Sequence, residues 1–109
     1  MNCPNIGEIR FSQKSVDAIE EIRRIKRSAN LLIHIIGAGT VVNIFLGNDA
    51  LKSAYSLYST DFEYMAKAMD AVPIIEKRRI LDVAKMAYLD TINYKEKQFW
   101  SAVVSGCSN

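Results

Sequence analysis

Residues 16–36 read VDAIEEIRRIKRSANLLIHII, and the spacing of their apolar side chains predicts a helix. The apolar residues follow one another at steps of three, four or seven, which places them on one face of an α-helix: Val16, Ile19, Ile22, Ala29, Leu32 and Ile36. Ser12 or Ser15 can cap its start, and Gly37 and Gly39 are plausible stops. Such a face needs other elements to cover it.

Two more helices are expected in the middle of the chain. One starts after Gly47-Asn48-Asp49, with an inner face formed by Ala50, Leu51, Ala54, Tyr55 and Tyr58. The next starts at Thr60, where Thr60 and Glu63 have the spacing of a capping box, and it buries Phe62, Met65, Ala66 and Met69. Val72-Pro73 ends it, because the residue before a proline leaves the α region.

A last helix is expected from Pro73 to Ser105-Gly106, with a kink or break at Asn93-Tyr94. Its inner face would hold Leu81, Ala84, Tyr88, Ile92, Phe99 and Ala102. Residues 40–46, TVVNIFL, are interpreted as a short buried helix, and the alternative is a two-stranded pairing of residues 6–11 with 40–46. The 109 residues therefore predict an all-α fold, a compact bundle of four to five helices with short loops, as a single helical domain over 1–109.

Charge is nearly balanced, with 14 Lys and Arg against 12 Asp and Glu and a net charge of +2. This balance does not favour a general nucleic-acid binder. Two basic clusters still offer possible phosphate contacts, namely Arg23, Arg24, Arg27, Arg78 and Arg79. Acidic neighbours surround both clusters, and Glu20 can pair with Arg24 four residues on. The preferred interpretation is a solvated helix face.

Residues 28–48 contain no charged side chain, and residues 31–46 are mostly apolar. As a helix, these sixteen residues would span about 24 Å, short of the roughly 30 Å hydrocarbon core of a bilayer. His34 and Asn43 would also be costly in lipid. The segment is therefore expected in the buried centre of the domain, with a membrane anchor or a partner-covered hairpin as alternatives.

The two cysteines, Cys3 and Cys107, lie near opposite ends of the sequence. Two cysteines do not form a disulfide framework, and no Cys/His cluster suggests zinc. The preferred interpretation is a pair of free thiols in a reducing cytosol, with a bridge between them as the alternative. A cytoplasmic location is expected.

Arg27 and His34 lie seven residues apart, so both can face one side of a helix. This pair resembles the Arg-x(4–6)-His signature of the HEPN ribonucleases, in which a basic residue and an imidazole from two protomers act on RNA. The resemblance covers Arg27 to His34 alone, and Ser28 stands where that family usually has a more polar residue. The alternative, which we prefer, is a histidine at a helix end whose ring bonds a backbone carbonyl.

Residues 94–104, YKEKQFWSAVV, carry more apolar bulk than a terminal helix needs. Phe99 and Trp100 point about 100° apart on a helix, so one narrow core does not hold both. We therefore expect an interface that includes Tyr64, Tyr94, Phe99, Trp100, Val103 and Val104, and the alternative is a wide buried face on a terminal helix.

The sequence carries no nucleophile elbow, phosphate-binding loop or zinc-protease motif, and we expect no enzyme, no catalytic residue, no metal and no cofactor. By elimination, the predicted function is protein binding, as an adaptor, an inhibitor or immunity-type protein, or an assembly subunit. The partner would be another protein or a second copy in a homodimer. The alternatives are a nucleic-acid-associated helical protein and a small membrane-associated protein anchored by residues 31–46.

Overall fold

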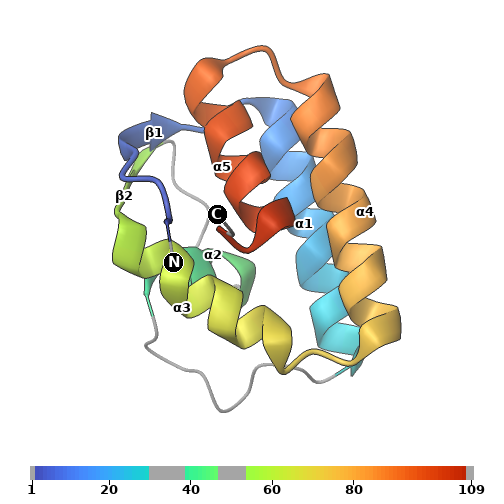
Figure 1. Ribbon diagram of the computed structural model, residues 1–109. Helices are drawn as coiled ribbons and strands as arrows, with labels where there is room; N and C mark the ends of the chain where they lie inside the picture. Colours follow the sequence, from blue (N-terminus) through green and yellow to red (C-terminus); the bar gives the residue numbers. More distant parts are fainter. Residues whose placement is uncertain (1, 30–38, 47–53, 108–109) are drawn as a thin grey trace.

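Five helices and a two-stranded sheet form the part of the chain that the structure, a computed structural model, describes: residues 2–29, 39–46 and 54–107 (Figure 1). In chain order they are β1 (Gly7–Arg10), α1 (Gln13–Ala29), α2 (Thr40–Leu46), β2 (Ala54–Leu57), α3 (Ser59–Asp70), α4 (Ile74–Asp90) and α5 (Tyr94–Ser105). The predicted all-α class and the compact bundle of four to five helices are confirmed, and the small sheet is an addition.

α1 and α4 lie side by side and run in opposite directions (Figure 1). α5 packs against α4, and its contacts with α3 and β1 place it in the middle of the molecule. α2 contacts both α1 and α3, so it closes the end of the core opposite the α4–α5 connection. Among the described residues, several large apolar side chains of α4 are exposed, including Ile75, Met86 and Leu89.

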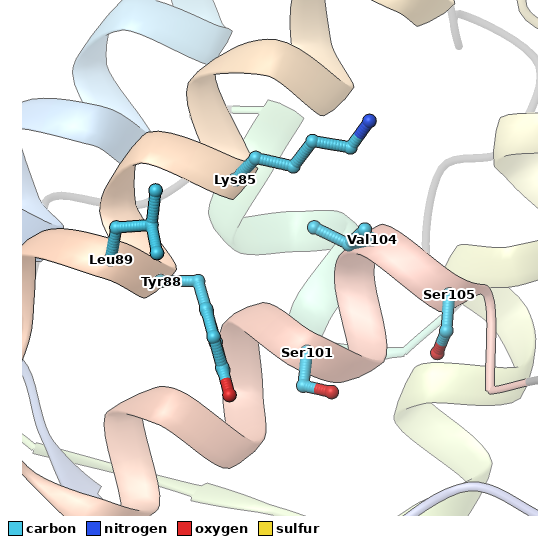
Figure 2. Close-up of a pocket in the computed structure, with 6 residues that line it drawn as sticks. All are labelled: Lys85, Tyr88, Leu89, Ser101, Val104 and Ser105. Atoms are coloured by element: carbon cyan, nitrogen blue, oxygen red, sulfur yellow. The ribbon is translucent and has the colours of Figure 1, made fainter.

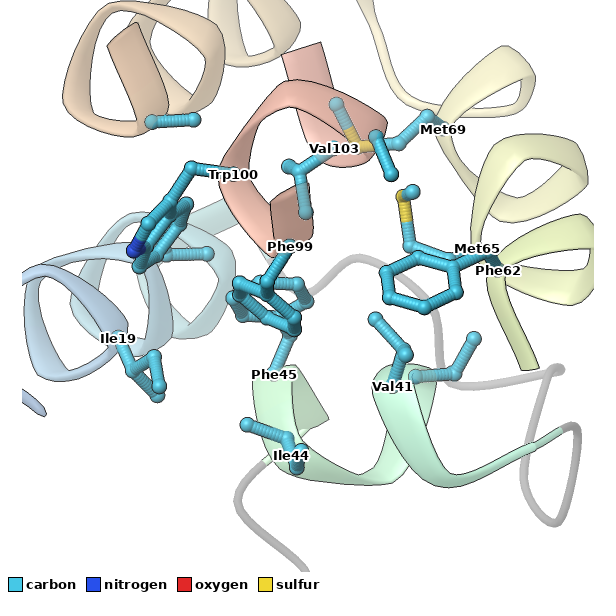
Figure 3. Close-up of a cluster of buried hydrophobic side chains, with 14 of the residues drawn as sticks. Ile19, Val41, Ile44, Phe45, Phe62, Met65, Met69, Phe99, Trp100 and Val103 are labelled. Carbon is cyan, nitrogen blue, oxygen red and sulfur yellow. The ribbon is translucent and has the colours of Figure 1, made fainter. Parts of the chain in front are cut away.

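The core is centred on two adjacent aromatic residues of α5, Phe99 and Trp100, which are both fully buried (Figure 3). Phe99 stacks edge-on against Phe11 and Phe62, with ring centroids 5.0 and 5.8 Å apart. Trp100 lies 6.2 Å from Phe45 and donates a 3.0 Å hydrogen bond from Nε1 to Ser15 Oγ. α5 therefore buries more than one face, because other elements surround it on several sides.

Residues 54–57 form a strand, where the sequence predicted the inner face of a helix after residue 49. β2 pairs antiparallel with β1, in a register that places Ile9 opposite Tyr55 and Gly7 opposite Leu57. This pairing supplies the backbone partners that a four-residue edge such as β1 needs. A strand within residues 6–11 was part of the alternative interpretation only, and its partner is β2; residues 40–46 are helical, as we preferred. Ala50 and Leu51 lie outside the described residues.

α3 begins one residue earlier than predicted, at Ser59, and its capping residue is Asp61 instead of Glu63. One Asp61 carboxylate oxygen accepts the Tyr58 amide at 2.8 Å, and the other accepts the Thr40 amide at 2.9 Å. Asp61 therefore holds the starts of α3 and α2 together. The space is tight, because a Cβ on Gly39 would lie 3.1 Å from the Tyr64 ring.

Cys3 and Cys107 are joined by a disulfide, so the expectation of two free thiols is wrong. Their Cα atoms lie 4.7 Å apart although 104 positions separate them in sequence. The fold brings both ends of the described chain to the same place, beside α5, and sequence spacing gives no measure of that proximity (Figure 1). Among the helices that the structure describes, none is long and apolar enough to cross a membrane.

Candidate protein-binding surface

The connection between α4 and α5 exposes apolar side chains that the sequence pattern had assigned to the core. α4 ends at Asp90, and α5 starts after Asn93, whose side chain accepts the amides of Lys95 and Glu96 at 2.9 and 3.2 Å. This break resets the helical phase, so Ile92 is 96% exposed instead of buried. Tyr88, also predicted to face inward, is 38% exposed.

Tyr88, Leu89 and Val104 face the space between α4 and α5, and Ile92 and Tyr94 are exposed where the two helices are joined; these five side chains are here called the α4–α5 surface. At its centre is a groove of about 330 Å³ between the two helices, lined by Lys85, Tyr88, Leu89, Ser101, Val104 and Ser105 (Figure 2). Leu89 is 69% exposed. An exposed apolar cluster of this kind is typical of a contact surface for another molecule.

Two lysines lie at or near the groove: Lys85 lines it, and Lys97 contacts Tyr88, which also lines it. Lys97 donates a 2.7 Å hydrogen bond from Nζ to the Tyr88 carbonyl oxygen, and its ammonium stands 4.4 Å from the centre of the Tyr88 ring. These contacts fix the orientation of Tyr88 at the mouth of the groove. Lys85 extends along the other side of the groove (Figure 2). The α4–α5 surface therefore combines an apolar groove with two ammonium groups at or near it.

A second groove, of about 440 Å³, lies between α1 and α4 and has the opposite charge. Its floor is apolar and includes Ala18, Val83, Met86 and Ala87. Its edges carry four carboxylates and one ammonium, from Asp17, Glu21, Asp82, Asp90 and Lys14. A cationic segment with apolar side chains would complement this groove.

The predicted interface residues are distributed over different environments. Phe99, Trp100 and Val103 are core residues. A single core buries all three, although we expected them to cover too wide an arc of the helix for one core. Val104 is half-buried and lines the α4–α5 groove, and Tyr94 is 75% exposed at the start of α5. Tyr64 is exposed on α3, where Lys67 stands 6.0 Å from its ring, and it does not line the α4–α5 groove.

The five predicted phosphate contacts do not form one free basic surface. Arg23 donates a 2.8 Å hydrogen bond from Nε to the Ile44 carbonyl oxygen, so it ties α1 to α2. Arg24 pairs with Glu21 at 3.0 Å, and not with Glu20 as the spacing had suggested. Arg78 and Arg79 are exposed on α4. The backbone of Arg27 is in α1, but its side chain is not among those that the structure describes.

His34 lies outside the described residues, so the structure gives no geometry for the Arg27–His34 pair. The same holds for most of the uncharged segment 31–46, apart from Gly39 and α2. α2 itself is buried, with Val41, Val42, Ile44 and Phe45 in the core. Over the described ranges, no group of three or more His, Cys, Asp or Glu side chains is placed to hold a metal ion.

The sequence did not lead us to expect that the apolar side chains of Ile75, Met86, Leu89 and Ile92 are exposed. One signal was available, because apolar residues occur all around α4 instead of along one stripe. A helix of that kind is either covered on all sides or contributes to a contact surface, and the periodicity of a single helix does not distinguish the two cases.

No family model, no curated protein and no solved structure matches this chain.

Proposed function

We propose that this chain is a protein-binding module that acts through the α4–α5 surface, as an adaptor, an inhibitor or immunity-type protein, or an assembly subunit. The observation that carries the proposal is the exposure of Leu89, Ile92 and Tyr94 beside an apolar groove. Burying such side chains against a partner is favourable, at about 25 cal/mol per Å² of apolar surface.

The charges at the groove indicate the chemistry of the partner. Lys85 lines the groove, and Lys97 stands over the Tyr88 ring beside it. A partner segment with apolar side chains and a carboxylate would fill the groove and pair with these ammonium groups. The proposed partner is therefore another protein that presents an apolar, acidic segment.

The experiment places a photo-crosslinking amino acid at Ile92 in cells that naturally express the chain, with Glu20, on the exposed face of α1, as the control position. We expect an adduct of defined mass at Ile92 and none at Glu20. Leu89→Asp should abolish the adduct, and mass spectrometry should place the crosslink in an apolar, acidic segment. Adducts of the same mass at both positions, or an Ile92 adduct that Leu89→Asp leaves intact, contradict the proposal.

The disulfide also bears on the compartment. Stable disulfides are rare in a reducing cytosol and persist in oxidising surroundings. The bond between Cys3 and Cys107 therefore favours an oxidising compartment over the cytoplasmic location predicted from the sequence.

A further inference from the structure

α4 carries a second row of exposed side chains, here called the α4 stripe and defined by Ile75, Arg79, Asp82 and Met86. Their spacing of four, three and four residues places them on one face of the helix. Ile75 is 68% exposed and Met86 is 58% exposed. Among the described residues, Arg79 and Asp82 have no ion-pair or hydrogen-bond partner. The described part of the chain therefore leaves these two apolar and two charged side chains exposed.

The stripe is symmetric about its own centre. Ile75 and Met86 are equally far from the midpoint between residues 80 and 81, and so are Arg79 and Asp82. If a second α4 lay antiparallel across this midpoint, Ile75 of each copy would meet Met86 of the other. Arg79 of each copy would meet Asp82 of the other. Apolar side chains would pair with apolar ones and a cation with an anion, each twice, as a two-fold interface requires.

We propose that the α4 stripe is the interface of a symmetric homodimer in which the α4 helices of two copies pack antiparallel. The occupant of the stripe is thus a second copy of this chain. A different partner protein would not require the stripe to carry opposite charges at equal distances from its centre. The spacing of four and three residues is also that of a coiled-coil seam, the geometry in which antiparallel helices pack.

The α1–α4 groove supports the same arrangement. Asp82 and Met86 belong both to the stripe and to this groove. In the proposed dimer, the amino-terminal half of the second α4 passes the edge of this groove, where its Arg79 meets Asp82. The carboxylate at the edge of each groove therefore meets a cation of the other copy, and this attraction favours the antiparallel orientation as the two chains meet.

The dimer does not rest on the function proposed above. The α4–α5 groove lies between α4 and α5, and the α4 stripe borders the groove between α4 and α1. Leu89, three residues after Met86, borders both surfaces, but the two grooves open on different flanks of α4, so the dimer would leave the α4–α5 groove of each copy open. Failure of one proposal leaves the other standing.

The test measures the mass of the purified chain by sedimentation equilibrium over a range of concentrations. We expect a dimer for the natural sequence. Arg79→Glu and Asp82→Arg, each alone, should raise the dimer dissociation constant at least tenfold, because each change places two like-charge pairs in the interface. An equimolar mixture of the two variants should form a heterodimer, since every Arg79–Asp82 position is then again occupied by opposite charges.

Matched controls reverse charges away from the stripe, with Lys67→Glu on α3 and Glu20→Arg on the exposed face of α1. Both should dimerise as the natural chain does, and circular dichroism checks that every variant remains helical. A natural chain that stays monomeric at several hundred micromolar overturns the proposal. So does a dimer that survives both single reversals, or a mixture of the two variants that remains monomeric. The Ile92 crosslink should persist in Arg79→Glu, which separates this interface from the α4–α5 surface.

Discussion

Removing the disulfide with the double change Cys3→Ser and Cys107→Ser should cost this chain much of its stability. The bond closes a loop between residues 104 positions apart. In the chain-entropy model, a loop of about 100 residues lowers the free energy of the folded state relative to the unfolded chain by about 4.7 kcal/mol. Folded domains are stable by only about 5–15 kcal/mol in total, so the variant should lose a third or more of its stability.

The assay is thermal and urea unfolding of the natural chain and the double variant, each with and without a phosphine reductant. A loss of this size corresponds to a fall in Tm of about 20–35 °C for a domain of this length. The reductant should lower the Tm of the natural chain to that of the variant and leave the variant unchanged. The presence of the bond is tested by alkylating the unreduced natural chain under denaturing conditions, where only free thiols react. Two adducts would show that both thiols are free, and equal Tm values without reductant would show that the bond does not stabilise the fold.

Two further predictions concern side chains that were expected to bind partners but that the fold uses internally. Trp100→Ala should lower the free energy of unfolding in urea by about 3–5 kcal/mol, because it empties a buried aromatic site, whereas Tyr94→Ala at an exposed site should change it by less than about 0.5 kcal/mol. Similar losses for both would contradict the core assignment of Trp100. Arg23→Met should cost about 1.5–3 kcal/mol by removing the hydrogen bond to the Ile44 carbonyl, and Arg78→Met, on the exposed face of α4, should be nearly neutral in the same assay. If Arg23→Met leaves the free energy of unfolding unchanged, Arg23 is not needed for the fold and is again a candidate for contact with a partner.

Local signals predicted the helices well. α2 was recognised from the apolar run 40–46, and the boundary between α3 and α4 from Val72-Pro73. The break between α4 and α5 was anticipated at Asn93-Tyr94, where Asn93 now caps α5. Each of these features depends on residues within about one turn of the boundary, and short-range spacing carries that information.

The features that the sequence pattern missed depend on residues far apart in the chain. β2 was assigned to a helix because Ala54, Tyr55 and Tyr58 match helical spacing, yet the strand forms because β1 lies beside it. The sequence favoured free thiols because a reducing cytosol was expected, whereas the fold brings together two cysteines that lie 104 positions apart. In both cases the deciding interaction is with a segment whose position only the complete fold determines.

The candidate site is also hard to predict from sequence, because the exposure of its side chains depends on how many elements surround each helix. Phe99 and Trp100 point in different directions and are both buried, since α5 has elements around it on several sides. Leu89, in the last turn of α4, and Ile92, in the connection that follows, have the apolar character of core residues and are exposed, since among the described elements α4 makes most of its contacts toward α1 and α5. Apolar bulk on more than one face therefore indicates either a central helix or a contact surface, and the location of the helix in the bundle decides between them. The interface that we propose accordingly combines α4, the outer helix of the pair, with the exposed residues of α5 and leaves out Phe99, Trp100 and Val103.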